Sequence, residues 1–203
     1  MKRVAALVAA AFIAGCVSLG NAPAHEYYVL DDLGSAGVPA QAPRIDRVLL
    51  VGEASASPFY DTQSLVFSRA PGQRAYYQFA AWTERPASRF TELLIRRLDA
   101  GGAFRSVAAT TAGARGDLVL NVRLEEFYHD TGASPGRVRI EVSAELVDRA
   151  RRAIAAQRRF ARSAPTAADD APAAVAAFNR AVTGLLDEAS TWVEDAAVQA
   201  RKP

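Results

Sequence analysis

Residues 118–148 read LVLNVRLEEFYHDTGASPGRVRIEVSAELVD, and their alternation is the strongest structural signal in this 203-residue chain. In the second half, Val138, Ile140 and Val142 begin an apolar series that alternates with charged and polar residues. A period of two places one series on a buried face and the other on a wet face, which is typical of antiparallel strands. A similar alternation fills 118–124. The stretch therefore predicts two long antiparallel strands joined by a turn at 130–136.

Downstream, a third strand is expected at 154–160 and a linker from Ser163 to Asp170. Asp169 and Asp170, followed by Ala-Pro, are suited to capping a long helix that ends near residue 199. The apolar stripe of this segment repeats close to the helical period of 3.6 residues. The sequence therefore predicts a C-terminal helix packed against the sheet.

Upstream, residues 86–100 form a second helical pattern, with Thr83 as a plausible cap, Pro86 in the first turn and Gly101-Gly102 at the end. The remaining expected strands are 26–31, 45–52, 65–69, 74–80 and 104–110, with a surface loop at 38–43. The prediction is an α/β (α+β) fold. It consists of a single domain, residues 26–200, with a mixed, mostly antiparallel sheet and two main helices on one face.

Composition excludes several functions. The net charge is +2, and Lys2 and Arg3 at the N-terminus supply that excess, so no nucleic-acid partner is expected. The chain contains only two lysines, Lys2 and Lys202, and neither is internal. Phosphate-binding loops and Schiff-base chemistry both need an internal lysine, so neither is available.

Residues 132–136, GASPG, match the G-x-S-x-G pattern of hydrolase nucleophiles. That pattern requires a helix after the serine, whereas a strand is expected here, and Pro135 has no N–H to donate to an oxyanion. In a strand, Glu125 and His129 would share a face, with Asp130 next to them, but solvated charge at a strand end explains this group better than metal ligation does. No catalytic residue, metal or cofactor is predicted, so the chain is not expected to be an enzyme.

The N-terminus indicates a compartment. Lys2 and Arg3 precede an apolar segment, 4–15, that is too short for a membrane span but long enough for a signal-peptide core. It ends in Ile13-Ala14-Gly15-Cys16, which resembles a bacterial lipobox, and Cys16 is the only cysteine. The prediction is a signal peptide at 1–15, acylation of Cys16 with palmitate-type chains, and a lipidated tether at 16–25. An ordinary secretory signal is the alternative.

Two features of the surface remain. Six arginines between 149 and 162 can contact anionic head groups or form the wet face of a strand and its turn. Aromatic residues are concentrated in the first half of the folded part. Either they pack in the core, or some of them form an exposed groove for a partner or a lipid. The candidate contact residues are Tyr60, Tyr76, Tyr77 and Trp82.

The segment 76–86, YYQFAAWTERP, resembles the tyrosine strand, tryptophan and acidic-x-Pro helix entry of the ABC-type transport auxiliary lipoproteins, the PqiC-like family. The Tyr27-Tyr28-Val29-Leu30 strand after the lipobox and the buried strand around 48–51 also resemble that family. Ile13 departs from the leucine that is usual in the lipobox.

The resemblance implies an envelope lipoprotein without enzymatic activity, held at a membrane and facing the periplasm. Val17, which follows Cys16, is not the aspartate that enteric-type sorting rules associate with the inner membrane, so the outer membrane is expected. Its implied partners are an MCE-domain protein and an ABC permease/ATPase complex that moves lipids or other hydrophobic molecules. Self-association into a homo-oligomer is left open. The alternatives are an outer-membrane assembly scaffold and a direct lipid carrier, neither with an ABC partner.

Overall fold

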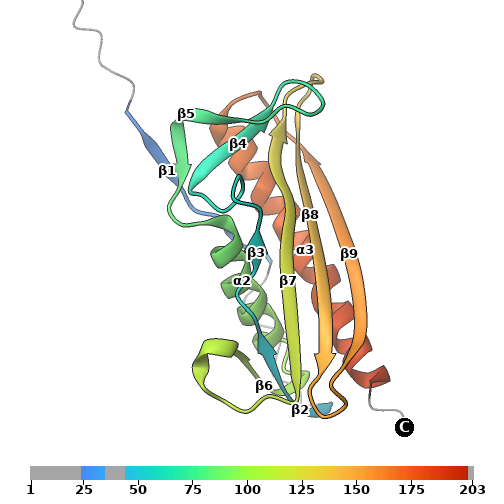
Figure 1. The fold of residues 1–203 in the computed structure, drawn as a ribbon. Coiled ribbons are helices and arrows are strands. Elements are labelled where there is room, and N and C mark those ends of the chain that lie inside the picture. Colours follow the sequence, from blue (N-terminus) through green and yellow to red (C-terminus); the bar gives the residue numbers. More distant parts are fainter. Residues whose placement is uncertain (1–23, 35–43, 201–203) are drawn as a thin grey trace, which may run out of the picture.

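In the computed structural model, the described residues are 24–34 and 44–200, and they form one sheet with two main helices on one face (Figure 1). The expectations for 1–23 and for the loop at 38–43 lie outside these residues. The strands are β1 (Glu26–Tyr28), β2 (Ile45–Val51), β3 (Ser55–Ala56), β4 (Ser64–Ser68), β5 (Ala75–Trp82), β6 (Phe104–Ala109), β7 (Leu118–Asp130), β8 (Arg137–Asp148) and β9 (Ala153–Pro165). The helical elements are α2 (Pro86–Ala100), the short η1 (Thr110–Ala112) and α3 (Ala171–Gln199).

The long strands β7, β8 and β9 form the antiparallel part of the sheet, as predicted from their alternation. On the other side of β7, the shorter strands β2, β3 and β4 follow one another along its length, all parallel to it. Beyond them, β6 pairs with β2, and β5 pairs with β4 and then with β1. The α/β prediction is confirmed, and the sheet is mixed.

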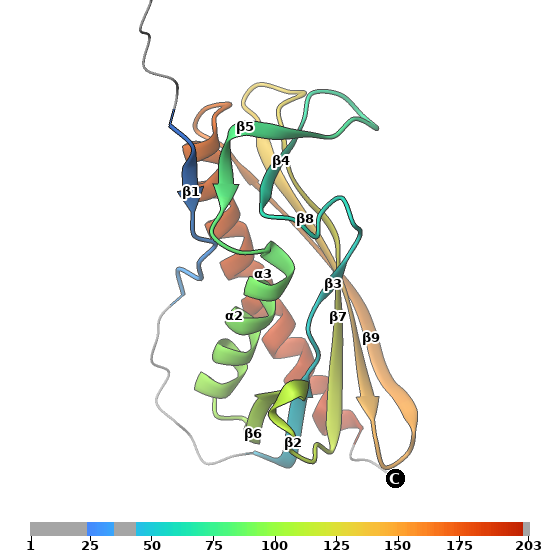
Figure 2. The same ribbon diagram turned by 60° about the vertical axis from the view of Figure 1, so that its left-hand side comes forward.

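Both main helices cover the same face of the sheet, as expected, and no helix of residues 24–34 and 44–200 lies over the outer face of β7–β9 (Figure 2). Alternate residues of β8 explain this arrangement. Val138, Ile140 and Val142 are buried toward the helices, whereas Arg137 and Arg139 are exposed on the other side. None of the described helices is long and apolar enough to cross a membrane.

Two local expectations need correction, and one short strand was not expected. The N-cap of α2 is Arg85 rather than Thr83, and it makes no side-chain capping hydrogen bond. Residues 163–165, expected in a linker, continue β9 because they pair with β8 as far as Pro165. The short strand β3 was not predicted, since a two-residue strand gives no periodicity to detect.

The start of α3 follows the prediction. Asp170 is its N-cap, and the Asp170 carboxylate accepts a hydrogen bond from the backbone N–H of Ala173 at 2.9 Å. This bond satisfies one of the donors that a helix N-terminus leaves without a partner.

Candidate functional site

The predicted aromatic residues separate into core and surface. Trp82 is only 1% exposed, and its ring makes edge contacts with Phe127 at 5.8 Å and Phe178 at 5.5 Å between centroids. Tyr60 is also buried, and its hydroxyl accepts a hydrogen bond from the Arg74 guanidinium at 2.9 Å. Both side chains have the packing role that the sequence left open, and neither presents a ring to a partner.

Tyr76 lies on the surface at the start of β5, with 42% of its area exposed. Its ring stacks on Phe59, with 4.6 Å between the centroids, and its hydroxyl donates to the Phe59 carbonyl oxygen at 3.1 Å. Tyr76 is therefore exposed and at the same time held in one orientation by its neighbour.

Tyr77, the next residue, is half-buried and contacts a fully buried histidine. The Tyr77 hydroxyl lies 2.7 Å from Nδ1 of His129, and the Thr166 hydroxyl lies 3.3 Å from Nε2. If Tyr77 donates to Nδ1, then Nε2 carries the proton and donates to Thr166. The imidazole is then fully paired in its neutral form, which is the form that burial favours.

The ionisation of this pair follows from the burial. Burial lowers the pKa of His129, although the carboxylate of Asp169, 3.9 Å from Nε2, acts in the opposite direction. Burial, and then the negative charge of Asp170, raises the pKa of the Tyr77 hydroxyl to about 12. Tyr77 therefore stays protonated at neutral pH, which makes it a hydrogen-bond donor rather than a nucleophile.

The expectation that Glu125 and His129 share a strand face is wrong. The pairing of β7 with β8 shifts between Leu124 and Glu126, so one extra residue is inserted into β7. Such a bulge reverses the faces of the residues that follow it. Glu125 consequently lies on the outer face, whereas His129 points to the core. Across 24–34 and 44–200, no three His, Cys, Asp or Glu residues gather as they would around a metal ion.

The G-x-S-x-G segment lies in the turn between β7 and β8, and a strand follows Ser134. The structural context that a hydrolase nucleophile requires is therefore missing, as the alternation predicted.

Part of the arginine stretch is held in ion pairs. Arg158 and Arg162 both contact the carboxylate of Glu188 on α3, and Arg159 pairs with Glu141 on β8 at 2.8 Å. These arginines connect the edge strand β9 to its neighbours. Arg149 and Arg152 are exposed in the β8–β9 turn.

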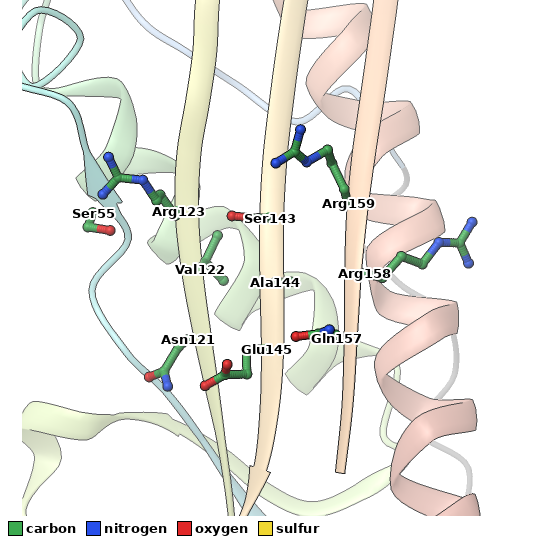
Figure 3. A pocket seen from close by; sticks show the side chains of 10 residues that line it. All are labelled: Ser55, Asn121, Val122, Arg123, Ser143, Ala144, Glu145, Gln157, Arg158 and Arg159. Atoms are coloured by element: carbon green, nitrogen blue, oxygen red, sulfur yellow. The ribbon is translucent and has the colours of Figure 1, made fainter. Parts of the chain in front are cut away.

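The outer face of the sheet carries an open hollow of about 590 Å³, drawn in Figure 3. The sequence predicted a wet face for the polar residues of these strands but gave no sign of the hollow. It is lined by Ser55, Asn121, Val122, Arg123, Ser143, Ala144, Glu145, Gln157, Arg158 and Arg159. Figure 3 shows Arg158 directed toward α3, away from Arg159 and the outer face.

The charges of this face are partly paired among themselves. Glu125 accepts hydrogen bonds from Ser143 at 2.8 Å and from Arg123 at 3.2 Å. The bond from Ser143, together with the bond and charge of Arg123, lowers the pKa of Glu125. The result is a polar surface of fixed hydrogen-bonding groups, which suits a reversible protein contact better than an apolar ligand.

The chain therefore forms a mixed-sheet domain whose outer face is polar. Among the described residues, no group of side chains is arranged as a known catalytic site. The model of the family described as "ABC-type transport auxiliary lipoprotein component" matches residues 28–190. The chain belongs to that family, which is a family of auxiliary transport lipoproteins and not a known enzyme family. Membership accords with a location in the cell envelope.

Solved structures share this fold. The Xanthomonas campestris protein XCC0632 is 25% identical, has a TM-score of 0.78, and the match covers 86% of this chain and 97% of that one. An uncharacterised protein at 15% identity has a TM-score of 0.65, over 84% of this chain and 99% of that one. The Chlamydia trachomatis protein CT253, at 11% identity, has a TM-score of 0.52 over 75% and 98% of the two chains and shares the fold alone. No curated protein matches the sequence.

Proposed function

We propose that this chain is acylated at Cys16, faces the periplasm from the outer membrane, and docks a partner protein of an ABC transporter. The partner is an MCE-domain protein associated with the permease and ATPase, and the complex moves lipids or other hydrophobic molecules across the envelope. The family match over residues 28–190 carries this proposal. Residues 16–25 serve as the tether between the lipid and the domain.

Core packing supports docking over direct lipid carriage. A carrier needs an apolar cavity, and the natural place for one is between the sheet and its helices. At the level of Trp82 that space holds Phe127 and Phe178, whose rings stack with 4.3 Å between centroids. Close-packed aromatic rings leave no room there for an acyl chain.

The outer face of β7–β9 is the surface we assign to the protein partner. The helices cover the opposite face, and the hollow of Figure 3 presents Arg123, Glu145 and Gln157 outward. Mixed charge of this kind favours specific, reversible association. Tyr76 and Tyr77 stay in the proposal as partner- or lipid-binding residues, while Tyr60 and Trp82 are left out because they are buried.

The test is a crosslinked pull-down of the full-length lipoprotein from membranes, with proteins identified by mass spectrometry. The wild type should recover an MCE-domain protein together with an ABC permease or ATPase. Glu145→Arg, which reverses a charge in the hollow, should reduce that recovery severalfold. Asp99→Arg makes the same charge change at an exposed position on α2 and is the matched control.

A Cys16→Ala variant separates anchoring from docking, since it should leave the membrane fraction. Recovery of outer-membrane assembly proteins alone would replace the proposal with a scaffold role. Recovery of no protein, with lipid still bound to the purified chain, would favour the carrier.

A further inference from the structure

Exposed aromatic side chains are concentrated in one part of the fold. Among the described residues, the large aromatics on the surface are Tyr27 (64% exposed), Phe59, Tyr76 (42%) and Phe79 (40%). We call these four residues the aromatic rim. They lie on β1, on β5, and in the turn whose Phe59 stacks on Tyr76. Single exposed apolar residues are ordinary on protein surfaces, but four aromatics on neighbouring segments are not.

The rim lies at the end of the molecule where the chain enters the domain. In Figures 1 and 2, the start of β1, the first half of β5 and the β4–β5 hairpin all lie at the same end of the molecule, with β1 at one side of that end and the hairpin at the other. The parallel pairing of Tyr27 with Ala81 confirms that β1 lies beside β5. Cys16 precedes Ala24, the first described residue, by eight positions. Eight residues span at most about 30 Å, so an acylated Cys16 holds this end close to the bilayer.

Among the described residues, the opposite end carries no exposed large aromatic side chain, and it is not the end where the described chain begins. It contains the β8–β9 turn and the end of α3 (Figure 1). The 29 residues of α3 alone extend about 43 Å. Its exposed large apolar residues are Ile154 and Val198, which are aliphatic. A tether of about 30 Å leaves the tilt of the domain free, so a second contact is needed to orient it.

We infer that the aromatic rim lies in the interfacial layer of the membrane that carries the anchor, and that it orients the domain so that the β8–β9 turn and the end of α3 point away from the lipid. This inference rests on the proposed acylation of Cys16. Aromatic rings are favoured at the level of the lipid head groups, where an apolar ring and a polar hydroxyl are both satisfied. The neighbouring Arg69 is exposed in the β4–β5 turn, and a cation at this end of the domain favours anionic head groups.

The experiment uses the chain's unusual cysteine content. Because Cys16 is the only cysteine, an introduced thiol is the only reactive one once Cys16 is acylated. The full-length lipoprotein carrying Tyr27→Cys, Phe79→Cys or Ile154→Cys is spin-labelled and reconstituted into phosphatidylethanolamine/phosphatidylglycerol vesicles. Power saturation then compares the accessibility of each label to oxygen and to a water-soluble nickel chelate. The labelled wild type is the blank, and Ile154→Cys (56% exposed) is the matched control.

The expected result is a ratio of oxygen to nickel accessibility several times higher at positions 27 and 79 than at 154. Equal, water-like ratios at all three positions would overturn the rim inference. So would rim labels that become immobile only when the MCE-containing complex is added, because the occupant would then be protein.

Mass spectrometry of the Cys16 peptide tests the anchor separately. An acylated Cys16 with water-exposed rim labels would leave the proposed function standing and remove the inference. An unmodified Cys16 would remove the proposed anchor and, with it, the inference that rests on that anchor.

Discussion

The two ends of β5 both contain aromatic residues but lie in opposite environments. Its last residues, Ala80 to Trp82, are buried, and Trp82 packs among aromatic rings beneath α3. Its first residues are largely exposed, with Tyr76 and Phe79 on the surface and Tyr77 half-buried between them. One strand thus supplies both a core anchor and a surface patch. An aromatic residue in a sequence consequently indicates neither role until the path of the strand is known.

The largest effect is expected in the buried half. Trp82→Ala removes a ring that is 1% exposed and leaves a cavity against Phe127 and Phe178. Substitutions of this kind cost about 3–5 kcal/mol of unfolding free energy. Urea denaturation at neutral pH measures it. Trp192→Ala, at a half-buried position on α3, is the matched control and should cost less. Equal losses of unfolding free energy would mean that the buried Trp82 contributes no more to the core than the half-buried Trp192.

An intermediate effect is expected at the boundary between the halves. Tyr77→Phe removes the hydroxyl 2.7 Å from Nδ1 of His129 and leaves that buried nitrogen without its partner. An unsatisfied buried polar group costs about 1–3 kcal/mol. The neighbouring Tyr76→Phe removes a hydroxyl that bonds to a carbonyl at the surface, so it should change stability much less. Urea denaturation of the two variants tests whether the loss of unfolding free energy depends on the burial of the hydrogen bond. Equal losses at these adjacent positions would show that burial does not decide it.

A smaller effect is expected on the pH dependence of stability, because it involves the uptake of a single proton. Burial lowers the pKa of His129 in the folded chain, so the unfolded chain takes up a proton first as the pH falls. Stability contributed by the neutral histidine is present above the unfolded pKa and is lost on acidification from about pH 7 to pH 5. His129→Gln should flatten the dependence of the melting temperature on pH in this range. His25→Gln, at an exposed position, is the matched control.

These comparisons also show what the sequence predicts well. The bounds of α2 agree with the prediction because Pro86 marks the first turn and Gly101-Gly102 mark the end of the helix. The strands β7 and β8 agree because their alternation is long. Local signals of this strength act within a few residues, so they need no knowledge of the rest of the fold.

The site was harder to predict, because irregular pairing decides which way side chains face. Between Ser64 and Val66 of β4, the partner on β5 changes from Ala81 to Tyr76, so several residues of β5 bulge out of register. The bulge in β7 likewise separates Glu125 from His129. A pattern with a period of two carries no mark of such insertions, and each one reverses the faces that follow. The burial of Trp82 and the exposure of Phe79 therefore required the three-dimensional structure.

The smallest effect on stability is expected in the exposed half. Phe79→Ser alters a side chain that is 40% exposed, and surface changes of this kind stay within about 0.5 kcal/mol. Phe127→Ser, at a residue that is 3% exposed, makes the same change in the core and should cost several times more. Urea midpoints at a constant m-value measure both variants. Since Phe79→Ser leaves the fold intact, any change it causes in membrane orientation is assigned to the rim itself. A large loss of stability at Phe79 would instead make the exposed half of β5 part of the core.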